Sequence, residues 1–165
     1  MKTVLVLRHA KSSWAFADLG DHERPLNERG RRDAPRMGRL LRREGIVPEL
    51  ILSSTAERAL ATAEAVALDS GYEAEIEVLR RLYHAGPETY LDILRNMGDS
   101  VGRVMMVGHN PGMEELVTSL TGTWVRMPTA ALAQIELPVA HWRELTDSVT
   151  GTLVNLWRPK EVKDR

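Results

Sequence analysis

Two histidines and two arginines occupy positions from which they could act together on a phosphate group. Arg8 and His9 directly follow an apolar run, and His109 stands in a Gly-His-Asn-Pro-Gly turn after a similar run. Arg58 comes shortly after a Ser-Ser pair that ends a third apolar run. Guanidinium groups carry a permanent charge and present planar donor forks that match phosphate oxygens. Glycine-rich turns and helix N-termini add backbone N–H groups for the same anion, so the pattern predicts a phosphate-binding crevice.

The composition indicates which residue type could be the nucleophile of such a site. A neutral imidazole can accept a phosphoryl group covalently, and a second imidazole can stabilise the charge of the transition state. The chain has no cysteine. This excludes a cysteine-nucleophile phosphatase, a thiolate zinc site and a disulfide framework together, and it leaves histidine as the natural nucleophile.

Strand-length apolar runs alternate along the chain with segments of helical period. This alternation predicts a three-layer α/β/α sandwich with a mainly parallel central sheet. The strands are expected at Thr3–Leu7, Leu50–Leu52, Glu75–Val78, Arg103–Val107 and Ala131–Leu137, with a late strand pair around Trp142–Leu145 and Leu153–Leu156. Ligands of such sheets bind outside the carboxyl ends of the strands. The two histidines and two arginines should therefore meet in one crevice.

Cap and proline signals place the helices. The sequence Ser54-Thr55-Ala56-Glu57 has the pattern of a capping box and predicts a helix that stops before Gly71. Two further helices are expected at Gly86-Pro87 and after Pro111-Gly112.

The Asn27–Glu44 segment also has a helical pattern, but Pro35 lies inside it. Proline lacks the backbone donor that a helix interior needs. The helix is therefore either kinked at Pro35 or begins near Asp33 with Pro35 in its first turn, and we favour the later start.

The length and the charge of the chain limit the classes of protein to which it can belong. The chain has 165 residues, of which 43% are hydrophobic. This predicts one globular domain over residues 1–160 with a short tail at 161–165. Its 22 basic and 23 acidic residues nearly cancel, which argues against nucleic acid and membrane partners. The apolar stretch at the N-terminus is too short for a signal peptide. We expect a monomer in the cytoplasm.

Four segments together resemble the histidine phosphatase superfamily, which includes the phosphoglycerate mutases. They are Leu7-Arg8-His9-Ala10-Lys11-Ser12-Ser13-Trp14, Arg24-Pro25-Leu26, Ser53-Ser54-Thr55-Ala56-Glu57-Arg58-Ala59 with Thr62-Ala63, and Val107-Gly108-His109-Asn110-Pro111-Gly112. The segments occur in the family order and span essentially the whole chain. Ala10 replaces the glycine that is usual in the first segment, as it often does in members close to the SixA-type phosphohistidine phosphatases.

The resemblance implies a role for each matching residue. His9 would be the phosphorylated nucleophile, and Arg8 and Arg58 would clamp the phosphoryl oxygens. His109 would be the second, phosphate-binding histidine. Arg24 and Ser12 would also contact the substrate. The implied fold is phosphoglycerate mutase-like.

A general acid for ester hydrolysis is not evident. Mutase-like relatives supply a glutamate near the segment that here reads Leu82-Tyr83-His84-Ala85-Gly86-Pro87-Glu88. The candidates in this chain are Tyr83, His84, Glu88, Asp18, Asp21 and Glu23. A phosphoramidate such as phosphohistidine needs less acid catalysis, because its leaving nitrogen can already carry a proton. The absence of an evident general acid therefore favours a phosphohistidine protein as the substrate.

Other features of the sequence have ordinary explanations. His22, His84 and His141 lack partners at metal-ligand spacing, so we expect no metal and no cofactor. The tryptophans at 124, 142 and 157 are expected in packing. Seven arginines between Arg29 and Arg43 are expected on a solvated helix face balanced by Asp33 and Glu44, because no interleaved aromatic residues could stack on bases.

Three functions remain open at this stage. The first is a phosphatase that removes phosphate from histidine in a signalling or phosphorelay protein. The second is a small-molecule phosphomonoesterase with the same chemistry. The third is a phosphate-binding module without turnover, which the intact set His9, Arg8, Arg58 and His109 disfavours, because a binding module has no need of the nucleophile.

Overall fold

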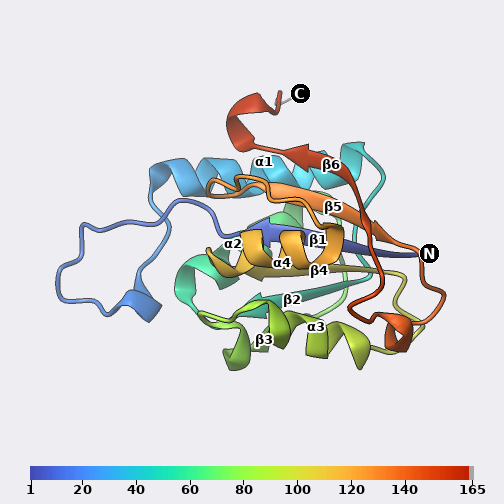
Figure 1. The fold of residues 1–165 in the computed structure, drawn as a ribbon. Coiled ribbons are helices and arrows are strands. Elements are labelled where there is room, and N and C mark those ends of the chain that lie inside the picture. The colour runs from blue at the N-terminus through green and yellow to red at the C-terminus, as the bar shows by residue number, and fades with distance from the viewer. Residues whose placement is uncertain (164–165) are drawn as a thin grey trace.

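A six-stranded mixed sheet forms the centre of the computed structural model, which describes residues 1–163 (Figure 1). The strands lie in the order β3-β2-β4-β1-β5-β6. Their bounds are β1 Lys2–Arg8, β2 Leu50–Ser54, β3 Ile76–Leu79, β4 Arg103–Gly108, β5 Leu132–Leu137 and β6 Thr152–Trp157. The pairs β1–β4, β2–β4 and β2–β3 are parallel, whereas β5 and β6 pair antiparallel at one edge. The predicted mainly parallel sheet is therefore confirmed.

Helices cover both faces of the sheet. Their bounds are α1 Glu28–Arg43, α2 Glu57–Ser70, α3 Pro87–Arg95 and α4 Gly112–Thr121. Alternate side chains of β1 pack on opposite faces of the sheet. Val4 and Val6 belong to the core cluster that contains residues of α3 and α4. Leu5 and Leu7 belong to the cluster that contains residues of α1 and α2. This arrangement is the expected three-layer sandwich.

The predicted start of the helix near Asp33 is wrong. Asn27 has extended backbone angles, and its side chain accepts a hydrogen bond from the Gly30 N–H at 2.9 Å, which caps the helix from Glu28 onward. Pro35 lies inside the helix. Its missing donor costs about 3 kcal/mol in a helix interior. The burial of Met37, Leu40 and other residues along one face offsets that cost.

Two other local expectations are also corrected. Ser54 does not cap α2: it is the last residue of β2, and the N-cap position is Ala56, which makes no side-chain cap. Instead of a strand, Trp142–Glu144 forms a short 3-10 helix. The Glu144 carboxylate accepts hydrogen bonds from the N–H groups of Ala140 and His141, and this closes a turn that an extended strand could not make.

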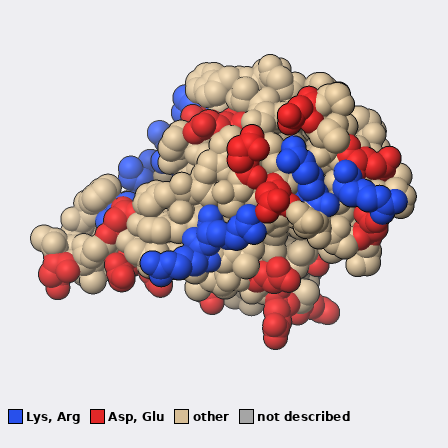
Figure 2. Space-filling model, turned by 60° about the horizontal axis from the view of Figure 1, so that its bottom comes forward, with Lys and Arg blue, Asp and Glu red and all other residues tan. Residues whose placement is uncertain are grey.

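The surface carries both charges. On the face shown in Figure 2, basic and acidic side chains lie interspersed. Among the described residues, no helix is long and apolar enough to cross a membrane.

The predicted tail, residues 161–165, lies partly outside the described residues. Glu161 is the last residue of the 3-10 helix Pro159–Glu161, which begins at the buried Pro159.

Candidate active site

The carboxyl ends of the neighbouring strands β1, β4 and β2 meet at one edge of the sheet. Arg8 pairs in register with Gly108, and the His9 N–H donates to the Gly108 carbonyl at 3.0 Å. A hollow of about 220 Å³ opens there. Its lining includes all six residues predicted from the sequence, which are Arg8, His9, Ser12, Arg24, Arg58 and His109. The fold thus brings the predicted set together.

His9 is held with one ring nitrogen free. Its Nδ1 lies 2.8 Å from the carbonyl oxygen of Ala10. A carbonyl only accepts, so Nδ1 carries the proton and Nε2 keeps its lone pair. The side chain is almost fully buried, and burial together with the positive charges of Arg58, Arg8 and Arg24 lowers the pKa of His9 to about 4. At neutral pH the ring is therefore uncharged and able to act as a nucleophile.

His109 lies against His9, with 5.1 Å between the ring centroids. Its Nε2 is 2.8 Å from the Ser54 hydroxyl oxygen. Burial and the neighbouring His9 and Arg58 lower the pKa of His109 to about 3. Its Nδ1 is buried and has no hydrogen-bond partner among the described residues. An unpaired buried nitrogen of this kind calls for a ligand or a water that completes it.

The two arginines beside the histidines also keep unpaired donors. Arg58 donates to the Asp21 carbonyl at 2.6 Å and to its Oδ2 at 3.0 Å, and Arg8 donates to the Met127 carbonyl at 3.1 Å. The Nε atoms of both arginines are buried and have no partner among the described residues. Arg8, His9, Arg58 and His109 form what we call the floor of the site. The floor contains no carboxylate, which makes it a strong place for an anion.

Arg24 and Ser12 lie beside the floor. The Arg24 guanidinium donates to the Ser12 hydroxyl at 2.8 Å and to Asp21 Oδ1 at 3.2 Å. The Trp14 ring lies over the guanidinium, with 3.5 Å from the central carbon to the ring centroid. Arg24 is thus fixed on three sides and buried, although it comes from the loop before α1.

The exposed Asp21 and His84 and the half-buried Tyr83 form a group that we call the rim. The Tyr83 hydroxyl donates to Asp21 Oδ2 at 2.5 Å, and His84 Nε2 lies 3.4 Å from the same oxygen. His84 also lines the hollow, with backbone angle φ of +56°. Although its partial burial acts in the opposite direction, hydrogen bonds from Tyr83 and Arg58 hold the pKa of Asp21 well below its usual range. Asp21 therefore remains ionised at neutral pH and joins the rim to Arg58.

A threonine connects the segments of His9 and Arg58 below the floor. The Ala10 N–H donates to Thr62 Oγ1 at 2.9 Å, and the Thr62 hydroxyl donates to the Arg58 carbonyl at 2.7 Å. Thr62 is fully buried in α2. The sequence analysis placed this residue in a family motif without giving it a role, because its effect depends on a contact across 52 residues of chain.

The structure places most of the candidates for a general acid outside the hollow. Glu88 lines a separate hollow with Leu91 and Arg95, and Asp18 is exposed and does not line the site. Asp21 is held as a carboxylate and is therefore unsuited to donate a proton at neutral pH. Only His84, of these candidates, lines the hollow. In residues 1–163, no group of three or more histidine, aspartate, glutamate or cysteine side chains could hold a metal ion.

Comparison with known proteins identifies the family. A model described as the histidine phosphatase superfamily (branch 1) matches residues 4–85. A solved structure from Agrobacterium tumefaciens, assigned as a SixA-type phosphohistidine phosphatase, is 31% identical, with a TM-score of 0.82 over 96% of this chain and 98% of that chain. The chain belongs to the histidine phosphatase superfamily. Its likeness to SixA phosphatases over nearly the whole chain makes it a phosphatase, and the resemblance inferred from the four sequence segments is confirmed.

Two other relatives extend the comparison. The protein histidine phosphatase SixA, solved with tungstate, is 25% identical, with a TM-score of 0.83 over 98% of this chain and 99% of that chain. A Mycobacterium tuberculosis protein is 32% identical over 150 residues, which cover 84% of this chain and 91% of the relative. The likeness therefore extends over most of the chain rather than over an isolated motif.

Proposed function

We propose that this phosphatase works through a covalent phosphohistidine on His9 and removes phosphate from histidine side chains of a signalling or phosphorelay protein. One observation carries the first half of the proposal: the neutral His9 ring has its Nδ1 bound to Ala10 and its Nε2 free, inside a buried group of cationic donors. A nucleophile and an anion cradle are thereby combined in one hollow.

The reaction would proceed in two displacements. In the first, the His9 Nε2 lone pair attacks phosphorus, a new N–P bond forms, and the bond from phosphorus to the leaving nitrogen breaks with its electron pair. The leaving imidazole keeps the proton that it already carries. In the second, water attacks phosphorus, the N–P bond to His9 breaks, and inorganic phosphate and a proton are released. Arg8, Arg58 and His109 would stabilise the equatorial oxygens in both steps.

The rim supports a phosphoramidate as the bond that is broken. An alkoxide leaving group needs a strong acid close to it. Asp21 cannot serve because it is held ionised, and Glu88, Asp18 and Glu23 do not line the hollow. His84 does line it, but its Nε2 lies 3.4 Å from the Asp21 carboxylate, so the hollow offers no carboxylic acid to an alkoxide. Phosphohistidine does not need that acid, since its imidazole leaving group can be protonated on the other ring nitrogen before the P–N bond breaks.

The first experiment tests the nucleophile. The protein is mixed with phosphoramidate as an activated donor, quenched in base, and digested, and the acid-labile phosphate is mapped by mass spectrometry. We expect label on His9, no label in His9→Ala, and a loss of turnover of at least about 10³-fold in that variant. His141→Ala is the matched control, because His141 pairs with Asp99 outside the hollow. Label on another residue, or full turnover in His9→Ala, would contradict the proposal.

The second experiment tests the substrate. Rates of phosphate release are compared for a histidine-phosphorylated protein domain, free phosphohistidine and a panel of sugar and glycerate phosphates. We expect the phosphohistidine substrates to be preferred. Efficient hydrolysis of the small phosphate esters, with phosphohistidine protein left untouched, would replace the proposal with a small-molecule phosphomonoesterase that uses the same floor.

A further inference from the structure

A groove leads away from the active site along the surface. A hollow of about 350 Å³ shares Arg8, Lys11, Asn110 and Thr129 with the hollow of the site. A third hollow, of about 210 Å³, shares Arg29, Arg126 and Pro128 with the second. The shared lining residues place the three hollows next to one another along the surface. A substrate bound at His9 can therefore extend along the second and third hollows, which we call the basic groove.

The side chains of the basic groove are mostly cationic. Its cations outside the floor are Lys11, Arg29, Arg126, Arg158 and Lys160. Its two carboxylates are already engaged: Glu114 accepts the Met127 N–H at 2.7 Å, and Glu161 lies 3.6 Å from Arg158. The groove thus has an excess of positive charge in a chain whose overall net charge is only −1.

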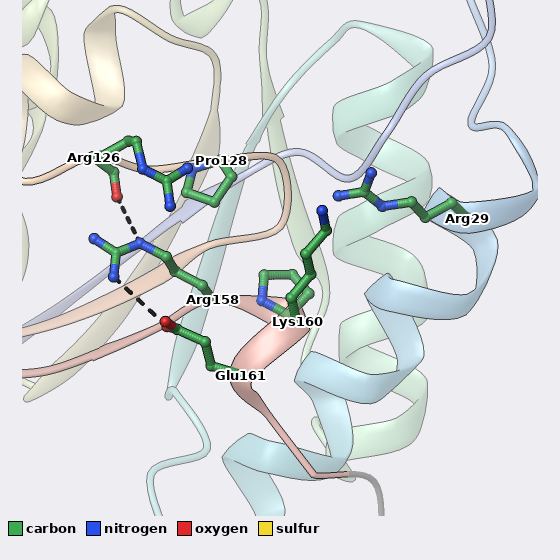
Figure 3. A pocket seen from close by; sticks show the side chains of 7 residues that line it. Arg29, Arg126, Pro128, Arg158, Lys160 and Glu161 are labelled. Carbon is green, nitrogen blue, oxygen red and sulfur yellow. Dashed lines mark hydrogen bonds and ion pairs between the residues drawn. The ribbon is translucent and has the colours of Figure 1, made fainter.

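Several of these cations have no partner of their own. Lys11, Arg126 and Lys160 make no side-chain hydrogen bond or ion pair with any residue of the described part of the chain. In Figure 3 the Lys160 ammonium and the Arg29 guanidinium point toward one another across the third hollow. Arg29 has a single long contact, 3.4 Å to Asp33. Like charges that approach in this way repel each other, and an anion placed between them would remove that repulsion.

The groove is built from three parts of the chain. Arg29 lies in the first turn of α1, Arg126 lies between α4 and β5, and Arg158 follows β6. The Arg158 Nε donates to the Arg126 carbonyl at 3.1 Å, which fastens two of these parts together. The buried Pro159 next to Arg158 holds the third hollow against α1, where Arg36 donates to the Pro159 carbonyl at 3.5 Å. The cations are therefore arranged by the tertiary structure.

The lining favours an acidic polypeptide over a nucleic acid. Within the described residues, no aromatic side chain lines the basic groove, so bases would have nothing on which to stack. The loop beside the site instead exposes Trp14, Phe16 and Leu19, with exposed fractions of 75%, 50% and 39%. This loop extends from the body of the molecule (Figure 1). Exposed apolar side chains next to a charged groove are typical of a surface that binds another protein.

We propose that the basic groove binds an acidic segment of the phosphorylated protein while its phosphohistidine lies at His9. This inference rests on the proposed function, because it assigns the substrate class of the same site. Aspartate and glutamate side chains of the segment would pair with Lys11, Arg126 and Lys160, and they would raise the rate of productive encounter.

Two histidine-phosphorylated peptides of equal length provide the test. One carries aspartate and glutamate on both sides of the phosphohistidine, and the other carries asparagine and glutamine at the same positions. At low salt we expect kcat/KM to be about tenfold higher for the acidic peptide, and we expect the ratio to fall toward one at 0.5 M NaCl, where surface charges are screened. Equal values for the two peptides at low salt would overturn the proposal.

Charge-reversal variants locate the effect. In the double variant Arg126→Glu, Lys160→Glu the ratio of the two kcat/KM values should fall to about one or below. Arg143→Glu is the matched control, because Arg143 is exposed in the 3-10 helix that caps the opposite end of the sheet, beside Asp99. A ratio that survives in the double variant, or falls equally in the control, would contradict the assignment. Thermal unfolding of all three proteins shows that they remain folded.

A binding measurement separates this proposal from the proposed function. If neither peptide is dephosphorylated, the proposed substrate is wrong, and the groove is then tested by fluorescence anisotropy with the unphosphorylated peptides. Binding of the acidic peptide that is lost in the double variant supports the groove. Binding of inorganic triphosphate that depends on Arg126 and Lys160, without any preference between the peptides, would identify a small polyanion as the occupant and overturn the acidic segment.

Discussion

The floor and the rim of the site differ in how they are built. His9, His109 and Arg58 of the floor are 6%, 4% and 3% exposed, and they follow strand ends that are paired in register. The rim is more open to solvent: Tyr83 is half-buried, and the side chains of Asp21 and His84 are 40% and 60% exposed. Buried charges interact strongly and exposed ones weakly. The floor is therefore suited to the chemistry on phosphorus, and the rim to orienting groups and to admitting a large substrate.

Asp21 is the point at which the two regions meet. Its carboxylate contacts Arg58 of the floor and Arg24 beside it, while Tyr83 and His84 contact the same group from the rim. The carboxylate thereby orients two guanidinium groups without standing among the floor residues. Removing it should weaken the site less than a change in the floor itself.

The largest expected effect is a loss of stability in acid that originates in the floor. An unfolded histidine has a pKa near 6.5, whereas the pKa values of His9 and His109 are about 4 and 3 in the folded chain. Below pH 6.5 the unfolded chain binds protons that the folded chain does not, so the free energy of unfolding falls as the pH decreases. Between pH 7.5 and 4.5 each histidine should contribute a loss of about 2 to 3 kcal/mol.

Urea unfolding at several pH values in that window measures this loss. His9→Asn should show a shallower dependence on pH than the original chain. NMR titration of the two histidine rings should give midpoints well below 6. A free energy of unfolding that stays constant from pH 7.5 to 4.5 would show that the floor does not hold its histidines neutral.

The next effect concerns the planar fork of Arg58. Arg58→Lys keeps the positive charge but loses the paired donors that contact Asp21 and, in our proposal, the phosphoryl oxygens. We expect kcat/KM on phosphohistidine to fall about 100-fold. Arg81→Lys is the control, since Arg81 makes an exposed ion pair with Asp92 and should change the rate by less than about twofold. Equal effects in the two variants would remove the distinction between floor and surface.

A smaller effect is expected where rim and floor meet. Asp21→Asn keeps the shape of the side chain but loses its charge and one acceptor, so Arg58 and Arg24 should be held less firmly. We expect kcat/KM to fall about tenfold, by the same factor at every pH between 6 and 8, because the carboxylate positions groups and transfers no proton. Asp18→Asn, in the same loop, should leave the rate nearly unchanged. A fall in kcat/KM that appears only above or only below pH 7 would instead indicate that Asp21 acts as an acid.

The smallest effect is expected within the rim. Tyr83→Phe removes the hydroxyl that donates to Asp21 and leaves the ring in place. A single hydrogen bond to an exposed carboxylate should change kcat/KM only about threefold. Tyr72→Phe controls for the chemical change, because the Tyr72 hydroxyl accepts from the Ile51 N–H and donates to the Glu75 carbonyl, and Tyr72 does not line the hollow. A loss of 100-fold or more in Tyr83→Phe would assign chemistry to the rim and break the contrast.

The floor could be predicted from the sequence because strand ends mark it. Arg8, His9 and His109 follow continuous apolar runs, and parallel strands bring their carboxyl ends to one edge. Asp21 had no comparable signal: it contacts Arg58 across 37 residues and Tyr83 across 62 residues, from a loop without periodicity. It entered the sequence analysis only as one of several possible acids.

Local patterns also failed where tertiary contacts decide the outcome. Ser54 has the pattern of a helix cap, but its hydroxyl lies in the last position of β2 and contacts His109. Pro35 suggests a late helix start, but the packing of α1 against α2 and the Asn27 cap extend the helix past it. The basic groove combines Arg29, Arg126 and Arg158 from three elements, and no window of sequence contains them together.

The position of Thr62 has a mechanical consequence. The Thr62 Oγ1 accepts a hydrogen bond from the residue after the proposed nucleophile and donates to the backbone of Arg58, which is proposed to hold the phosphate. A displacement of α2 should therefore move the backbone beside His9 and the backbone of Arg58 in the same direction, which would preserve the spacing between the proposed attacking nitrogen and the guanidinium. Such a linkage lets the loops around the site rearrange for a bulky partner while the reacting groups keep their alignment.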